Sequence, residues 1–175
     1  DFARADQYLK QAAEVYEGDP RLLLFLYNNR GNVLLRFEKD AAATVQYRRA
    51  VDIARSLNSE SLLPPILANL ARSLIASEKL DEADVVIREG MEIVRRNGDK
   101  NGEAQLLALA ADSAYHRGQL ARARELIERS FKGVDIADTP IAYRDAHLTA
   151  YNVYRALNEG SRALPHLERV RKLGD

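Results

Sequence analysis

The sequence predicts an all-α protein built from repeated helical hairpins, and three observations lead to this prediction. The chain resembles itself at a period of 40 residues, its apolar residues recur at spacings of three and four, and no strand pattern competes. Its 175 residues and 19.6 kDa correspond to one domain. We therefore expect a single stack of hairpins over residues 1–175.

Four sequence columns, each with one residue per period, carry the repeat. The first column lies in the first half of each unit, the second follows 12 residues later, and the others follow after four and three more residues. The second column is alanine in all four units. The columns are Gly31, Ala71, Ala111, Tyr151; Ala43, Ala83, Ala123, Ala163; Tyr47, Ile87, Ile127, Leu167; and Ala50, Gly90, Ser130, Val170.

The spacing of the last three columns predicts a helix that is buried on one face. Charged residues and glycines interrupt the apolar pattern between the two halves of each unit, so each unit is expected to be a hairpin of two helices. Small residues that face each other let two helix axes approach to the short end of the usual range of about 8 to 10 Å. The larger residue of the third column then fills the space beside them.

The element boundaries follow from capping signals. A helix at 2–17 comes first and has the spacing of a second helix. Asp19-Pro20 and Thr139-Pro140 place a capping side chain before a proline, and Asn97-Gly98 and Gly133 mark helix ends. We expect first helices at 20–36, 61–76, 102–116 and 140–156, second helices at 40–57, 80–96, 120–133 and 160–173, and repeats at 20–58, 59–98, 99–138 and 139–175.

These columns resemble the tetratricopeptide repeat family. Gly31, Ala43, Tyr47 and Ala50 reproduce the family pattern, and Tyr27 stands at its usual aromatic position. The chain departs from the family in its 40-residue unit, where about 34 is usual, in Tyr151, and in lacking the closing proline. Units of about 40 residues are similar to arrays attached to bacterial signalling proteins and to kinesin light chains. The resemblance implies a right-handed superhelix of stacked hairpins.

The first helices line the concave wall of such a superhelix, so candidate ligand-binding residues are sought there. Asparagine amides can pair with the N–H and C=O groups of an extended peptide whatever its sequence. The alternative is that these polar side chains are only solvated. The candidate groove residues are Asn28, Asn29, Asn32, Asn69, Arg72, Asp112, Tyr115, His116, Asn152 and Arg155.

One specialised binding mode is disfavoured. Tetratricopeptide domains that hold the C-terminal carboxylate of chaperone tails use two asparagines and three basic residues. Asn32 and Asn69 match the two asparagines, but the basic positions hold Asn28, Gln105 and Leu109. A chaperone adaptor is therefore not expected.

Composition disfavours several other classes. The chain has no cysteine, and its 26 basic residues balance 26 acidic ones, which argues against a nucleic-acid partner. His116, His147 and His166 lack metal-ligand spacing, and no catalytic or cofactor motif occurs. The longest apolar run, 22–27, is too short for a membrane span. We expect a soluble, cytoplasmic or periplasmic chain that is not an enzyme and needs no cofactor.

Together these observations predict a non-catalytic module that recognises a protein or peptide within a larger regulatory protein. The alternative is a dimerisation or structural sensory module of a bacterial signalling protein, such as a diguanylate cyclase, histidine kinase or transcription regulator. The helix at 160–173 has an apolar stripe and no polar capping helix after it. A homodimer through a terminal helix is therefore an open possibility.

Overall fold

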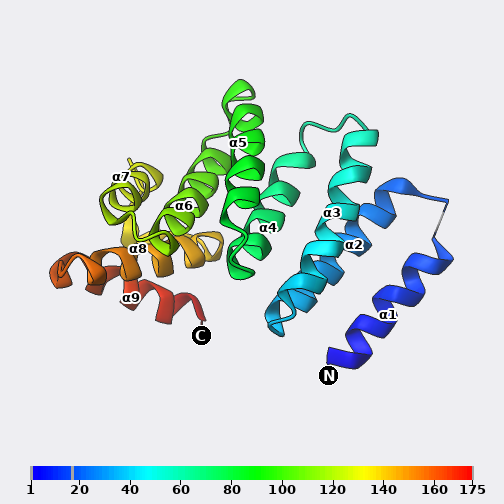
Figure 1. The fold of residues 1–175 in the computed structure, drawn as a ribbon, viewed down its shortest axis with the longest axis horizontal. Coiled ribbons are helices and arrows are strands. Elements are labelled where there is room, and N and C mark those ends of the chain that lie inside the picture. The colour runs from blue at the N-terminus through cyan, green and yellow to red at the C-terminus, as the bar shows by residue number, and fades with distance from the viewer. Residues whose placement is uncertain (1, 17, 175) are drawn as a thin grey trace. The chain divides into compact units, whose positions relative to one another are not determined.

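The computed structural model describes residues 2–16 and 18–174, which form nine α-helices, two short 3-10 helices and no strand (Figure 1). The all-α prediction is confirmed. The chain divides into two compact units that meet in the sequence between Asn97 and Gly98. The elements are α1 (Phe2–Val15), α2 (Pro20–Arg36), α3 (Asp40–Ser56), α4 (Leu63–Ala76), α5 (Leu80–Arg96), α6 (Lys100–His116), α7 (Leu120–Ser130), η1 (Ile136–Asp138), η2 (Ile141–Tyr143), α8 (Arg144–Ala156) and α9 (Gly160–Gly174).

Each unit is a stack of helical hairpins. In the first unit, α2 pairs with α3, α4 pairs with α5, the two hairpins meet through α3 and α4, and α1 lies on α2 (Figure 1). In the second unit, α6 pairs with α7 and α8 pairs with α9, while α8 also packs on α6 and α7. The predicted pairing of a first helix with the second helix of its own repeat is confirmed in all four repeats.

The turn inside each hairpin repeats with the same period as the sequence. One residue of each turn has a positive φ: 57° at Glu38, 59° at Glu78, 72° at Gly118 and 59° at Asn158. In each hairpin the next residue donates its N–H to the carbonyl five positions earlier, as Lys39 does to Leu34 at 3.0 Å. This is the hydrogen bond of a Schellman motif. The hairpins therefore share one turn geometry, although only one of the four turns uses glycine.

The capping signals predict one helix start correctly and one wrongly. Asp19 Oδ1 accepts hydrogen bonds from the N–H groups of Arg21 and Leu22, at 3.0 and 3.3 Å, as expected for an N-cap. The helix predicted to begin at 140 begins at Arg144 instead. Pro140 is extended, with φ −70° and ψ 166°, and a 3-10 turn follows it, so Thr139 is not a cap.

The second helix predicted at 120–133 is also shorter than expected and ends at Ser130. Gly133 does mark the exit, because its φ is +77°, but it lies three residues after the helix end. The result is an irregular connection between α7 and α8, covering 131–143, that contains η1 and η2. This connection therefore departs from the turn geometry that the four hairpins share.

The core of each hairpin is the column of alanines. Ala43, Ala83, Ala123 and Ala163 are all buried, as the sequence predicts. In the first hairpin the facing small residue is Gly31, and a Cβ atom built there would lie 2.5 Å from Cε1 of Tyr47. The Tyr47 side chain is itself fully buried. Gly31 is therefore required because the tyrosine ring fills the space that a side chain would need.

We expect Gly31→Ala to destabilise the protein. The new methyl group overlaps the Tyr47 ring, and overpacking of a filled core costs roughly 1 to 3 kcal/mol. This cost outweighs the gain of roughly 1 kcal/mol in helix propensity from glycine to alanine. Chemical denaturation followed by circular dichroism measures the change in the free energy of unfolding.

Two further variants separate overlap from propensity. Gly160→Ala introduces a methyl group into open space and is expected to leave stability unchanged or slightly higher. Gly31→Ala combined with Tyr47→Ile gives the residues that the second repeat holds in these columns, Ala71 and Ile87, and should recover part of the loss. A Gly31→Ala protein as stable as the native one would contradict this account of the core.

Candidate functional site

The first unit contains a cluster of polar side chains that joins its two first helices. Asn69 of α4 donates from Nδ2 to Oδ1 of Asn28 on α2, at 3.0 Å, and its own Oδ1 accepts from Nη1 of Arg72, at 2.8 Å. All three side chains are half-buried. We call Asn28, Asn69 and Arg72 the amide cluster. The sequence predicts these residues on one wall, and the structure brings them into contact.

The bonds within the amide cluster hold its groups in fixed directions. An asparagine amide has two N–H donors and an oxygen with two lone pairs, and a guanidinium has five N–H donors. The bond from Asn69 to Asn28 uses one of the two donors of Asn69 and one lone pair of Asn28, and Arg72 donates to the oxygen of Asn69. The two amides are therefore held in one direction before a ligand binds, which reduces the entropy cost of binding.

Asn32 has a structural contact that the sequence did not indicate. The hydroxyl of the buried Tyr47 donates to Oδ1 of Asn32 at 2.8 Å. Burial raises the pKa of Tyr47 to about 12, while the positive charge of Arg72 acts in the opposite direction. The exposed Asn32 amide thus satisfies the one polar atom of the tyrosine that fills the first hairpin.

Two neighbouring positions complete the picture of the first unit. Asn29 is exposed, on the same helix as Asn28. Arg30 binds Asp6 of α1 through two hydrogen bonds, of 2.5 and 3.2 Å, and these bonds lower the pKa of Asp6. The α1 helix is therefore tied to α2 by an ion pair beside the predicted wall.

The second unit presents aromatic and cationic groups in place of amides. The guanidinium of Arg155 lies over the ring of Tyr151, 5.8 Å from its centre, and a hydrogen bond to Tyr151 raises the pKa of Arg155. The electrostatic interaction with Tyr115 of α6 also raises the pKa of Arg155. We call Tyr115, Tyr151 and Arg155 the tyrosine–arginine cluster. Tyr151 was not predicted as a site residue, although it is the single bulky member of the small-residue column.

The remaining candidates of the second unit form a smaller group. His116 Nε2 lies 3.8 Å from Oδ1 of Asp112, one helical turn earlier, and the His116 ring meets the Tyr115 ring edge-on at 5.7 Å. Asn152 is half-buried on α8. These residues place one carboxylate and one imidazole next to the tyrosine–arginine cluster.

The other two histidines lie together, which the sequence analysis did not predict. His147 and His166 are both buried, and their Nδ1 atoms are 2.8 Å apart. They are 19 residues apart on different helices, so no local motif reveals the pair. Among the described residues no group of three or more histidine, acidic or cysteine side chains could hold a metal ion.

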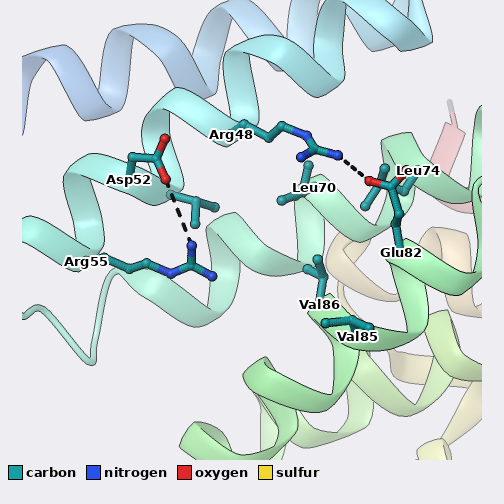
Figure 2. Close-up of a pocket in the computed structure, with 9 residues that line it drawn as sticks. Arg48, Asp52, Arg55, Leu70, Leu74, Glu82, Val85 and Val86 are labelled. Carbon is teal, nitrogen blue, oxygen red and sulfur yellow. Dashed lines mark hydrogen bonds and ion pairs between the residues drawn. The ribbon is translucent and has the colours of Figure 1, made fainter.

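A cavity of about 320 Å³ lies between α3, α4 and α5 in the first unit (Figure 2). Its floor contains the apolar Leu70 and Leu74, and the ion pair between Arg48 and Glu82 crosses from α3 to α5. Arg55 reaches Glu89 of α5 at 2.7 Å. These charges are paired with one another across the two second helices, so the arrangement fits a contact that holds neighbouring hairpins together.

The chain was compared with known proteins. No family model and no curated protein sequence matches it. Among solved structures it is similar to the crystal structure of BtubC (BKLC) from P. vanneervenii, with a TM-score of 0.70 and 20% sequence identity, over 99% of this chain and 73% of that chain. At this identity the similarity shows a shared helical fold. None of the described helices has the length and apolar character to cross a membrane.

The bond between Tyr47 and Asn32 predicts coupled effects on stability. Tyr47→Phe and Asn32→Ala should each cost about 0.5 to 1.5 kcal/mol, because each removes the same hydrogen bond. The double variant should cost less than the sum of the two single variants. Urea denaturation of all four proteins measures the coupling, and strictly additive losses would show that the bond contributes nothing.

Proposed function

We propose that this chain is a non-catalytic recognition module of the tetratricopeptide type that binds an extended peptide or protein segment along its first helices, within a larger regulatory protein. The observation that carries the proposal is the amide cluster, in which Asn28, Asn69 and Arg72 are linked across α2 and α4. The tetratricopeptide assignment is supported by the buried alanine column and by the period of 40 residues in sequence and turns.

The amide cluster suits an extended segment because peptide groups recur along it. Each peptide group offers one N–H and one C=O, and oriented amides can form hydrogen bonds with both whatever the side chains of the ligand are. In the second unit, the tyrosine–arginine cluster has the residue types that most often dominate the energetics of protein interfaces. We therefore assign backbone recognition to the amide cluster and side-chain contacts to the tyrosine–arginine cluster.

The non-catalytic part of the proposal rests on the chemistry of these groups. Amide side chains neither gain nor lose a proton near neutral pH, and a guanidinium stays charged. Tyrosine and arginine side chains stack and donate hydrogen bonds. These groups are suited to hydrogen bonding and stacking with a ligand, which is what a binding function requires.

We expect peptides selected from a random library displayed on phage to bind the native protein and to lose affinity for Asn28→Ala/Asn69→Ala. Removing two side chain–peptide hydrogen bonds weakens binding by about fivefold to about 150-fold. Isothermal titration with the selected synthetic peptide measures the dissociation constant, and circular dichroism checks that the variant keeps its helices.

The matched control is Asn97→Ala/Asn101→Ala, which removes two exposed asparagines outside the candidate set. This variant should bind the selected peptide like the native protein. A library that yields no binding peptide, or an equal loss of affinity in the two double variants, would overturn the proposal.

A second candidate function is self-association through α1. Tyr8 and Val15 on this helix are 63% and 76% exposed and offer apolar surface for a contact between two copies. If α1 forms a dimer contact, light scattering should show a dimer for the native protein and a monomer for Tyr8→Ser/Val15→Ser. Val85→Ser, which changes an exposed valine on α5, serves as the control. A native protein that stays monomeric at high concentration would eliminate this candidate.

A further inference from the structure

The second unit buries two imidazole rings against each other. His147 of α8 is 0% exposed, His166 of α9 is 4% exposed, and their Nδ1 atoms are 2.8 Å apart. The ring of Phe131, at the end of α7, lies 4.8 Å from the His147 ring and 4.9 Å from the His166 ring, between centres. Tyr154 stacks on His166 at 5.7 Å. The pair is thus enclosed largely by aromatic surface.

Hydrogen bonds connect the pair to the irregular segment between α7 and α8. His147 Nε2 lies 2.7 Å from Oγ1 of Thr139, which is buried between η1 and η2. Arg169 of α9 donates from Nε to the same hydroxyl oxygen, at 3.1 Å, and from Nη2 to the Thr139 carbonyl. The chain of bonds therefore holds the 131–143 connection onto the α8–α9 hairpin.

The chain of bonds requires a particular count of protons. Arginine can only donate, so the Thr139 hydroxyl accepts from Nε of Arg169. The same hydroxyl lies 2.7 Å from Nε2 of His147 and 3.5 Å from the carbonyl of Ile136, so Nε2 of His147 accepts from it or donates to it according to the tautomer. Between the two rings, one Nδ1 donates and the other accepts. Two Nδ1 atoms at this distance hold one proton between them. If both rings were charged, two N–H groups would face each other and the contact would break.

The charged groups around the pair are also unfavourable to protonation. On α9 the cations Arg162 and Arg169 act on the two rings, and the neighbouring Glu168 is exposed. Tyr154 is the titratable group that faces the pair from α8, where Asp145 is exposed. The connection contributes the Phe131 ring and the neutral Thr139, whose neighbour Asp138 is exposed. The core residues of α6 packed nearby, Ala104, Ala108 and Ala111, are uncharged.

We propose that His147 and His166 form a proton-controlled latch: while both imidazoles are neutral they fasten the 131–143 connection to the α8–α9 hairpin, and acidification releases it. The repeat itself indicates that the pair is a special feature. One period earlier the same two columns hold Leu107 and Leu126, and two periods earlier they hold Leu67 and Val86. An apolar pair is thus sufficient for packing at these positions, and the histidines add sensitivity to protons.

The direction of the pH effect follows from proton linkage. Burial lowers the pKa of both histidines to about 4, with the charge of the partner ring and of Arg169 adding to the effect on His147. In the unfolded chain both titrate near 6.5, so below that pH the unfolded state binds more protons. The stabilisation is complete above about pH 6.5 and is lost progressively as the pH falls toward 4.

The test compares the native protein with His147→Leu/His166→Leu, which restores the apolar pair of the preceding repeat. Between pH 7 and pH 5 the unfolding equilibrium constant of the native protein should rise at least about tenfold more than that of the variant. His116→Ala, which removes the exposed histidine of the same unit, should follow the native curve. Equal pH dependence in the native protein and the double variant would overturn the proposal.

Two measurements on the native protein keep the test decisive if the double variant does not fold. Imidazole ¹⁵N spectra should show both rings neutral at pH 5.5, with only one Nδ1 protonated. Amide protection factors over 134–143 should fall on acidification before those of α6. Two rings that titrate near 6.5, or a connection that opens only together with α6, would refute the latch.

Discussion

The close contact between the two helices of each hairpin is the interaction on which the other features depend. Ala43, Ala83, Ala123 and Ala163 place a single methyl group where a first and a second helix cross. In the first hairpin Gly31 gives up even that methyl group, because the ring of Tyr47 occupies its space. Since the helices approach this closely, side chains on the neighbouring faces have little freedom. The positions of the polar clusters are therefore determined by this packing of the helices.

The first unit illustrates how core packing determines the candidate site. The Tyr47 ring passes beside Gly31 and its hydroxyl reaches Asn32, so a core side chain holds a surface amide in place. Asn28 of α2 and Asn69 of α4 form a hydrogen bond between the first helices of two neighbouring hairpins. The stacking of hairpins therefore aligns amides that are 41 positions apart in the chain.

The second unit contains a connection that does not follow the repeat and that is held by buried hydrogen bonds. A helix end at Ser130 and the extended Pro140 leave an irregular connection whose Thr139 is buried by Arg169 and His147. On the surface of this unit, Glu128 of α7 binds Arg124 of the same helix and Arg162 of α9, and these bonds lower the pKa of Glu128. These exposed pairs contribute little to stability individually, so the buried bonds of the connection have the larger effect.

The sequence by itself determined the hairpins, because a period of 40 residues and a column of alanines are local patterns that helix geometry converts directly into a buried face. It also predicted which residues share the wall of a first helix. Only the tertiary structure decided which of these polar groups meet, since hydrogen bonds such as Asn28 to Asn69, Tyr47 to Asn32 and His147 to His166 join different helices. Such contacts depend on the rotation and distance between helices to within about an ångström, and a repeat pattern specifies neither.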